Sequence, residues 1–197
     1  MLEKYVEEEF EALCLKYGGN KVVKKVVLQF EDKRFFNNFK ETVTKNRRGE
    51  VGFLLKRKNG RFVLVRSKKY PSDVLRIPTG GIEFNETAEE ALYREVKEEL
   101  GVSFDVEKFE GLIEYEIHHE DDVLKFYSFL FVIDEIGGEI LKDATDNEIF
   151  KIREFHKEEL PEAEISLRNN NGSWKDWCSF RAELLKFYNE QNPKPEG

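Results

Sequence analysis

The stretch from Gly80 to Val102 constrains this chain more than any other, because it places several carboxylates on one helix. The sequence predicts that this helix runs from about Thr87 to Leu100. Its start is marked by Thr87 followed by Glu90, a capping-box pair, and Gly101 stands where a helix ends in a left-handed residue. At about 100° per residue, three of its glutamates fall within a sector of roughly 100°: Glu95, Glu98 and Glu99.

That sector does not face solvent, because Glu95 and Glu99 share a stripe with Ala88, Ala91 and Leu92. Like charges three and four residues apart destabilise a helix, and partial burial raises the cost. A cation between the carboxylates would remove this repulsion. Oxygen ligands with no His or Cys nearby favour magnesium or manganese over zinc. The alternative is a solvated acidic helix with ordinary Glu–Lys pairs, and charge and spacing alone leave both interpretations open.

The same segment resembles the Nudix box. That motif reads Gly, five residues, Glu, seven residues, Arg-Glu, an aliphatic, any residue, Glu-Glu, any residue, Gly and an aliphatic. Every required position is met here, by Gly80, Glu86, Arg94, Glu95, Val96, Glu98, Glu99, Gly101 and Val102. The hairpin predicted before the box and the strands predicted after it extend the resemblance over about residues 47–160.

The resemblance implies an enzyme that hydrolyses the diphosphate bond of a nucleoside diphosphate linked to another moiety, X. Such an enzyme releases a nucleoside monophosphate or X-phosphate and uses Mg²⁺, or Mn²⁺, held by the box helix. Carried over by position, the implied metal ligands are three carboxylates and one backbone carbonyl: Glu95, Glu98, Glu99 and Thr79. Arg94 would orient a glutamate, and Glu86 would support the loop before the helix. A nucleotide-binding sensor with a Nudix-like domain is the alternative function.

Hydrolysis also requires a general base that takes the proton of the attacking water. Glu95 is the first candidate and Glu148 the second, with Asp143 and Asp146 in the same acidic segment as Glu148. Residues 143–148 are equally typical of a turn that precedes a strand.

Basic residues just before the box are candidates for contacts with substrate phosphates: Arg66, Lys68, Lys69 and Arg76. Solvated surface positions would explain them as well. Three aromatic residues can stack on a base or pack in the core: Tyr70, Trp174 and Trp177. His118 and His119 fit a polar hairpin better than a second metal site. Outside the box, no residue pattern typical of a particular Nudix subfamily is complete, so the identity of X stays open.

The remaining pattern predicts an α/β protein of the α+β type, with a Nudix-like mixed β-sheet flanked by helices and extra helical segments at both ends. Lys58-Asn59-Gly60 between two apolar runs is a strong hairpin signal. The expected helices cover residues 2–17, 32–44, 87–100 and 174–191. The expected strands cover residues 22–30, 51–57, 61–66, 110–117, 123–133 and 148–155. We expect an extension at 1–46, which packs on the core or on a dimer partner. The Nudix domain follows at 47–160, then a C-terminal helix and disordered tail at 161–197.

Composition and charge limit the expected cellular location and the expected partners. The 197 residues contain no apolar run near the roughly 20 residues of a membrane span. The acidic N-terminus resembles no targeting segment, and Cys14 and Cys178 read as buried thiols, so we expect a cytoplasmic protein. A net charge of −8 makes nucleic-acid binding unlikely but is compatible with a small anionic substrate at a metal. Apolar stripes on the terminal helices indicate a possible homodimer.

Overall fold

The computed structural model describes residues 2–19, 21–68, 70, 74–146 and 148–193. Lys69 and most of the predicted tail therefore lie outside the described residues. The helices and strands are, in chain order, α1 (Lys4–Tyr17), β1 (Val23–Gln29), α2 (Lys33–Asn46), β2 (Gly49–Lys56), β3 (Phe62–Ser67), β4 (Thr79–Ile82), α3 (Ala88–Glu99), β5 (Ser103–His119), β6 (Asp122–Gly137), β7 (Ile149–Phe155), a 3₁₀ turn (Lys157–Glu159), α4 (Leu160–Arg168) and α5 (Lys175–Gln191).

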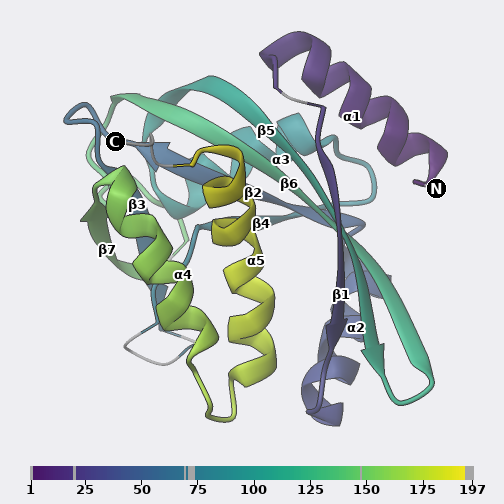
Figure 1. Ribbon diagram of the computed structural model, residues 1–197. Helices are drawn as coiled ribbons and strands as arrows, with labels where there is room; N and C mark the ends of the chain where they lie inside the picture. The colour runs from purple at the N-terminus through teal and green to yellow at the C-terminus, as the bar shows by residue number, and fades with distance from the viewer. Residues whose placement is uncertain (1, 20, 69, 71–73, 147, 194–197) are drawn as a thin grey trace.

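The strands form one mixed sheet in the order β1-β5-β6-β2-β3-β7, with β4 paired to β2 (Figure 1). Two of its pairings are parallel, β1 with β5 and β2 with β6. The others are antiparallel. The mixed sheet flanked by helices that the sequence predicts is therefore confirmed.

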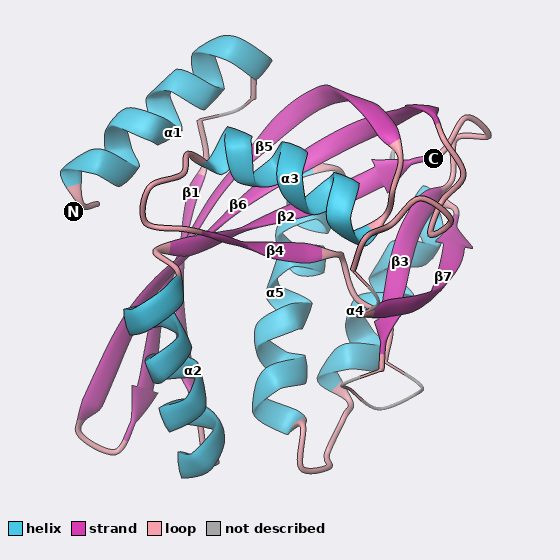
Figure 2. Ribbon diagram, turned by 180° about the vertical axis from the view of Figure 1, so that it is seen from behind, coloured by secondary structure: helices cyan, strands magenta, loops and turns pink. Residues whose placement is uncertain are grey.

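Helices cover both faces of the sheet and enclose two apolar clusters. On one face, α1 and α3 cover a cluster that includes Phe109, Phe129 and Phe131. On the other face, α2, α4 and α5 cover a second cluster that includes Phe126 and Phe180. Figure 2 shows α3 on one side of strand β4, with α2 and α5 on the other. Strand β4 thus runs between the two helix layers.

The predicted hairpin is present, but its strands separate early. Gly60 adopts the left-handed φ of +78° that the turn requires. Only Lys56 and Phe62 are paired across β2 and β3. Beyond this pair, β2 lies between β6 and β4, whereas β3 pairs with β7.

Strands β5 and β6 are longer than predicted, with 17 and 16 residues. The N-terminal half of β5 is rich in charged residues and therefore gives no apolar run. It is nevertheless a strand with alternating exposure, in which Phe104 is buried while Ser103 and Asp105 are exposed. Three register shifts bend this hairpin. The sequence also misses β4, because its two glycines disfavour a strand, and α4, whose first turn contains Pro161.

The terminal segments belong to the same fold. Strand β1 extends the sheet beside β5, and α1 packs on β5. Val6, Phe10 and Leu13 of α1 are buried within this chain, as is most of the apolar face of α5. Most of the stripes that suggested a dimer are therefore covered within the chain, whereas Tyr5 and Leu15 of α1 are exposed. Within the described part of the chain, no helix combines the length and the apolar character needed to cross a bilayer.

Candidate active site

Helix α3 presents the carboxylates because its two ends are fixed. The Thr87 hydroxyl accepts a hydrogen bond from the Glu90 N–H at 3.2 Å, and the Glu90 carboxylate accepts one from the Thr87 N–H at 2.8 Å. Gly101 has a φ of +68° after the last turn. Both predicted end signals are confirmed. The helix packs through its buried Ala88, Ala91 and Val96, and it contacts β2 and β4.

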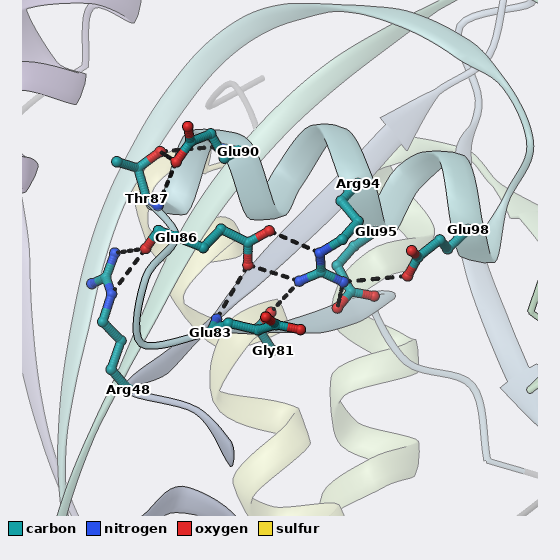
Figure 3. A network of polar contacts seen from close by, with 9 residues as sticks. All are labelled: Arg48, Gly81, Glu83, Glu86, Thr87, Glu90, Arg94, Glu95 and Glu98. Atoms are coloured by element: carbon teal, nitrogen blue, oxygen red, sulfur yellow. Dashed lines mark hydrogen bonds and ion pairs between the residues drawn. The ribbon is translucent and has the colours of Figure 1, made fainter. Parts of the chain in front are cut away.

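Arg94 organises the outer side of this helix (Figure 3). Its guanidinium donates to both oxygens of Glu86 at 2.8 Å and to the carbonyl of Gly81 at 2.8 Å. It also donates to Glu95 at 2.8 Å and to Glu98 at 3.3 Å. One rigid cationic fork thus connects the helix, the loop that precedes it and strand β4.

Glu95 lies directly over strand β4. A Cβ atom placed on Gly80 would come within 2.0 Å of the Glu95 Cγ and Cδ atoms, so only glycine leaves room for this side chain in its present position. Burial raises the pKa of Glu95, against the opposing effect of its hydrogen bond to Arg94. The first residue of the box therefore has a steric role, because a glycine at this position leaves space for the Glu95 side chain to pack against strand β4.

Glu99 is the most deeply buried carboxylate of the group. Its exposed fraction is 5%, and its Oε2 atom has no hydrogen-bond partner among the described residues. Burial raises the pKa of Glu99 to about 8, although Arg76 lowers it, and Glu95, Glu148 and Asp146 add to the rise. A buried carboxylate oxygen without a partner is costly unless another ligand satisfies it.

The acidic segment after β6 docks on the end of α3. The carbonyl of Glu98 accepts hydrogen bonds from the N–H groups of Thr145 and Asp146 at 3.0 and 2.9 Å. The Asp146 carboxylate accepts from the N–H of Glu148 at 2.8 Å. Glu148 lies 3.6 Å from the Arg76 guanidinium and accepts from the Ser67 hydroxyl at 3.4 Å. The turn therefore brings two further carboxylates to the end of the carboxylate helix.

These groups line one pocket of about 540 Å³. Of the residues that the sequence singled out, the pocket is lined by Thr79, Glu95, Glu98, Glu99, Asp146, Glu148, Arg76, Tyr70, Trp174 and Trp177. Arg94 lies behind the carboxylates and does not line it. Arg66, Lys68 and Asp143 are not among the lining residues. His119 lies on the β5–β6 hairpin, where its Nδ1 is 2.9 Å from the Phe30 carbonyl oxygen.

The pocket also contains cations that the sequence analysis missed, Arg47 and Arg181. Arg181 forms a buried ion pair with Glu50 at 2.7 Å, and the Ser128 hydroxyl donates to the same carboxylate at 2.7 Å. Burial lowers the pKa of Arg76, and Arg181 lowers it further. Arg181 is far from the box in sequence and lies within a helix that reads as core, so no local pattern identifies it.

The donor chemistry fits a hard divalent cation. The lining carboxylates supply oxygen ligands only, and the buried Oε2 of Glu99 requires a partner. Among the residues that the structure describes, no three His, Cys, Asp or Glu side chains are arranged to hold a metal ion. Glu95 and Glu98 bond to Arg94 instead, and the Glu98 side chain is 43% exposed.

Comparison with known proteins identifies the domain. The model of the NUDIX domain matches residues 46–178. The chain belongs to the Nudix family. A Nudix structure from Nitrosomonas europaea shares this fold, with a TM-score of 0.50 and 19% identity, over 72% of this chain and 87% of that one.

Two curated Nudix relatives match shorter stretches. An ADP-ribose pyrophosphatase of Methanocaldococcus jannaschii is 33% identical over 103 residues, which are 51% of this chain and 60% of the relative. An RNA pyrophosphohydrolase of Acinetobacter baylyi is 42% identical over 55 residues, 28% of this chain and 32% of the relative. The matched segments thus span less than two thirds of either relative.

Proposed function

We propose that this protein is a magnesium-dependent pyrophosphohydrolase that cleaves the diphosphate bond of a nucleoside diphosphate linked to another moiety. The observation that carries the proposal is the buried Oε2 atom of Glu99, which lacks a partner in a pocket lined by four further carboxylates. Such a site is stabilised by a divalent cation and can then accept a phosphate. The names of both curated relatives, which refer to pyrophosphate hydrolysis, support the same reaction class.

In this proposal Glu95, Glu98, Glu99 and the backbone carbonyl of Thr79 would hold Mg²⁺ or Mn²⁺. The bound ion would neutralise phosphate charge and make water more acidic. Arg94 orients Glu95 and Glu98 through its hydrogen bonds. Glu95 is the first choice for the general base, because burial raises its pKa and it lies beside the other carboxylates. Glu148, which faces Arg76 in the same pocket, is the second choice.

The partner we propose is a small nucleoside-diphosphate compound rather than a nucleic acid, because the net charge of −8 opposes binding to a phosphate backbone. Of the proposed phosphate contacts, Arg76 is supported by its place in the pocket. A homodimer is testable by light scattering, although the apolar face of α5 and most of that of α1 are buried within the chain.

The test is release of phosphate or nucleoside monophosphate from a panel of diphosphate compounds, with magnesium, with manganese and with a chelator. The panel includes ADP-ribose, nucleotide sugars, dinucleoside polyphosphates, NADH, coenzyme A and nucleoside triphosphates. We expect metal-dependent cleavage of at least one compound, lost in Glu98→Gln and retained in the exposed control Glu139→Gln. Tight binding of one compound without any cleavage would instead identify a nucleotide sensor.

A further inference from the structure

The pocket extends well beyond the carboxylates, and its far wall comes from helix α2. Four residues of α2 line it: Phe35, Asn38, Phe39 and Thr42. Their spacing of three, four and seven residues places them on one face of the helix. Helix α2 ends at Asn46, where the match to the family begins, so all four of these residues lie outside the matched segment.

Aromatic rings line two sides of this outer part. On α2, Phe35 and Phe39 are half-buried and stack on each other with centroids 6.3 Å apart. Tyr70 and Trp174 also line the pocket, and Tyr70 stacks on Trp177 with centroids 3.9 Å apart. Every nucleobase has a π-face, so flat aromatic surfaces of this kind bind bases with little dependence on their identity.

The distance between these walls is fixed by Asp176, a buried residue in the first turn of α5. Its carboxylate accepts hydrogen bonds from the N–H groups of Glu31 and Asp32, each at 2.8 Å. Asp32 in turn caps α2 by accepting from the Phe35 N–H at 3.0 Å. The start of α2 is thereby held against α5, and a rigid site loses little entropy when a ligand binds.

Asn38 and Thr42 are the polar members of this otherwise aromatic face. The Asn38 side-chain amide makes no hydrogen bond to any residue that the structure describes. The Thr42 hydroxyl donates to the Asn38 carbonyl at 2.9 Å, which leaves its lone pairs as acceptors. A side-chain amide offers a donor and an acceptor together and can therefore pair with the edge of a base.

We propose that the base of the substrate binds in this outer part of the pocket, with Asn38 on its hydrogen-bonding edge, so that α2 sets the base preference. This inference rests on the proposed function, which assigns the diphosphate to the carboxylate end. The volume of about 540 Å³ lies within the usual range for small-molecule sites. The preferred substrates are then nucleoside diphosphate compounds that share one base while the moiety X varies.

The chain offers a selective assay and matched controls. Both of its tryptophans, Trp174 and Trp177, line this pocket, so tryptophan fluorescence reports on this site alone. The ligands are the α,β-methylene analogues of ADP, GDP, CDP and UDP, whose P–C–P bridge resists hydrolysis. Asn38→Ala is compared with Asn37→Ala, an exposed neighbour that does not line the pocket.

Thr42→Ala provides a second comparison, with Thr44→Ala as its control. Both hydroxyls donate to the carbonyl four residues earlier, and that of Thr44 also donates to the Glu41 carbonyl at 3.1 Å, so each substitution removes a hydroxyl bonded to its own helix. We expect one analogue to be preferred by the wild type. Asn38→Ala should weaken the binding of that analogue about fivefold or more and reduce the preference for its base. Asn37→Ala should leave the affinity and the preference unchanged.

Three results would overturn the inference. They are the absence of saturable binding by all four analogues, equal behaviour of both lining variants and their controls, and an equal loss for all four bases in Asn38→Ala. The last result would place Asn38 on the ribose or phosphates. Base-selective binding without metal-dependent cleavage of any diphosphate compound would refute the proposed function and leave this subsite standing. Metal-dependent cleavage whose base preference is unchanged in Asn38→Ala and Thr42→Ala would support the proposed function and refute the base subsite.

Discussion

Replacing Gly80 by alanine tests whether the Glu95 carboxylate acts at its observed position. The backbone of Gly80 does not require positive φ, so alanine fits the strand itself. The added Cβ would lie 2.0 Å from the Glu95 Cγ and Cδ atoms. Carbon atoms normally keep about 3.5 Å apart, so the side chain must move by roughly 1.5 Å.

A displacement of about 1 Å at a catalytic group can cost about 100-fold in rate. We therefore expect Gly80→Ala to reduce kcat by about 100-fold, equivalent to about 2.7 kcal/mol in activation free energy. Stability should change little, because the clash involves a side chain that can rotate away. Alanine also lowers the entropy of the unfolded chain, worth about 0.4–1 kcal/mol in favour of folding.

The assay is turnover of the best substrate from the panel at saturating Mg²⁺, together with thermal unfolding and Mn²⁺ binding followed by electron paramagnetic resonance. Gly137→Ala is the control, since a Cβ there meets no atom within 4 Å. Wild-type kcat in a folded Gly80→Ala protein would show that Glu95 need not occupy its observed position. A lower kcat with a large loss of stability would also refute the argument, because it would show that the Glu95 side chain cannot rotate away from the added Cβ.

Three further predictions use other groups. Burial raises the pKa of Glu99 from 4.5 to about 8, so in metal-free protein its contribution to stability is complete below pH 4.5 and is lost as the pH rises toward 8. With chelator, Glu99→Gln should therefore unfold at a higher temperature than the wild type near pH 8, and an unchanged difference between pH 4.5 and pH 8 would contradict this. Glu50→Gln should cost about 3–5 kcal/mol in urea unfolding because Arg181 stays buried and charged, whereas adding Arg181→Met should restore part of it. If Glu148 is the base, Glu148→Gln should lower kcat strongly with little change in metal affinity, whereas Glu95→Gln should lower both because it also removes a proposed metal ligand; wild-type kcat in either variant would exclude that residue as the base.

The carboxylate helix could be predicted from sequence because all of its determinants are local. The capping pair of Thr87 and Glu90, the glycine after the helix and the spacing of the glutamates lie within one short segment. The helical period alone places Glu95 and Glu99 on a side that is at least partly apolar, and the structure buries both to different degrees.

The rest of the pocket depends on contacts between distant parts of the chain. The local sequence predicts a core or surface position for Arg181 and for the pocket-facing residues of α2. The fold places them in the same pocket as the box carboxylates. Of the three described basic residues before the box, Arg66, Lys68 and Arg76, only Arg76 lines the pocket; its short extended segment pairs with β3 through an isolated bridge to Val65. Such placement follows from tertiary pairing rather than from residue type.

The docking of the acidic segment on α3 has a dynamic consequence. Helix ends normally fray, yet here the carbonyl of Glu98 is bonded by Thr145 and Asp146, and that of Leu100 by Leu141 at 2.8 Å. The last helical turn and the segment that follows β6 therefore share their hydrogen bonds and should open together as one cooperative unit. The rates of amide hydrogen exchange at Glu98, Leu100, Thr145 and Asp146 should then change together, and they would report on the order of the proposed metal ligands and of Asp146.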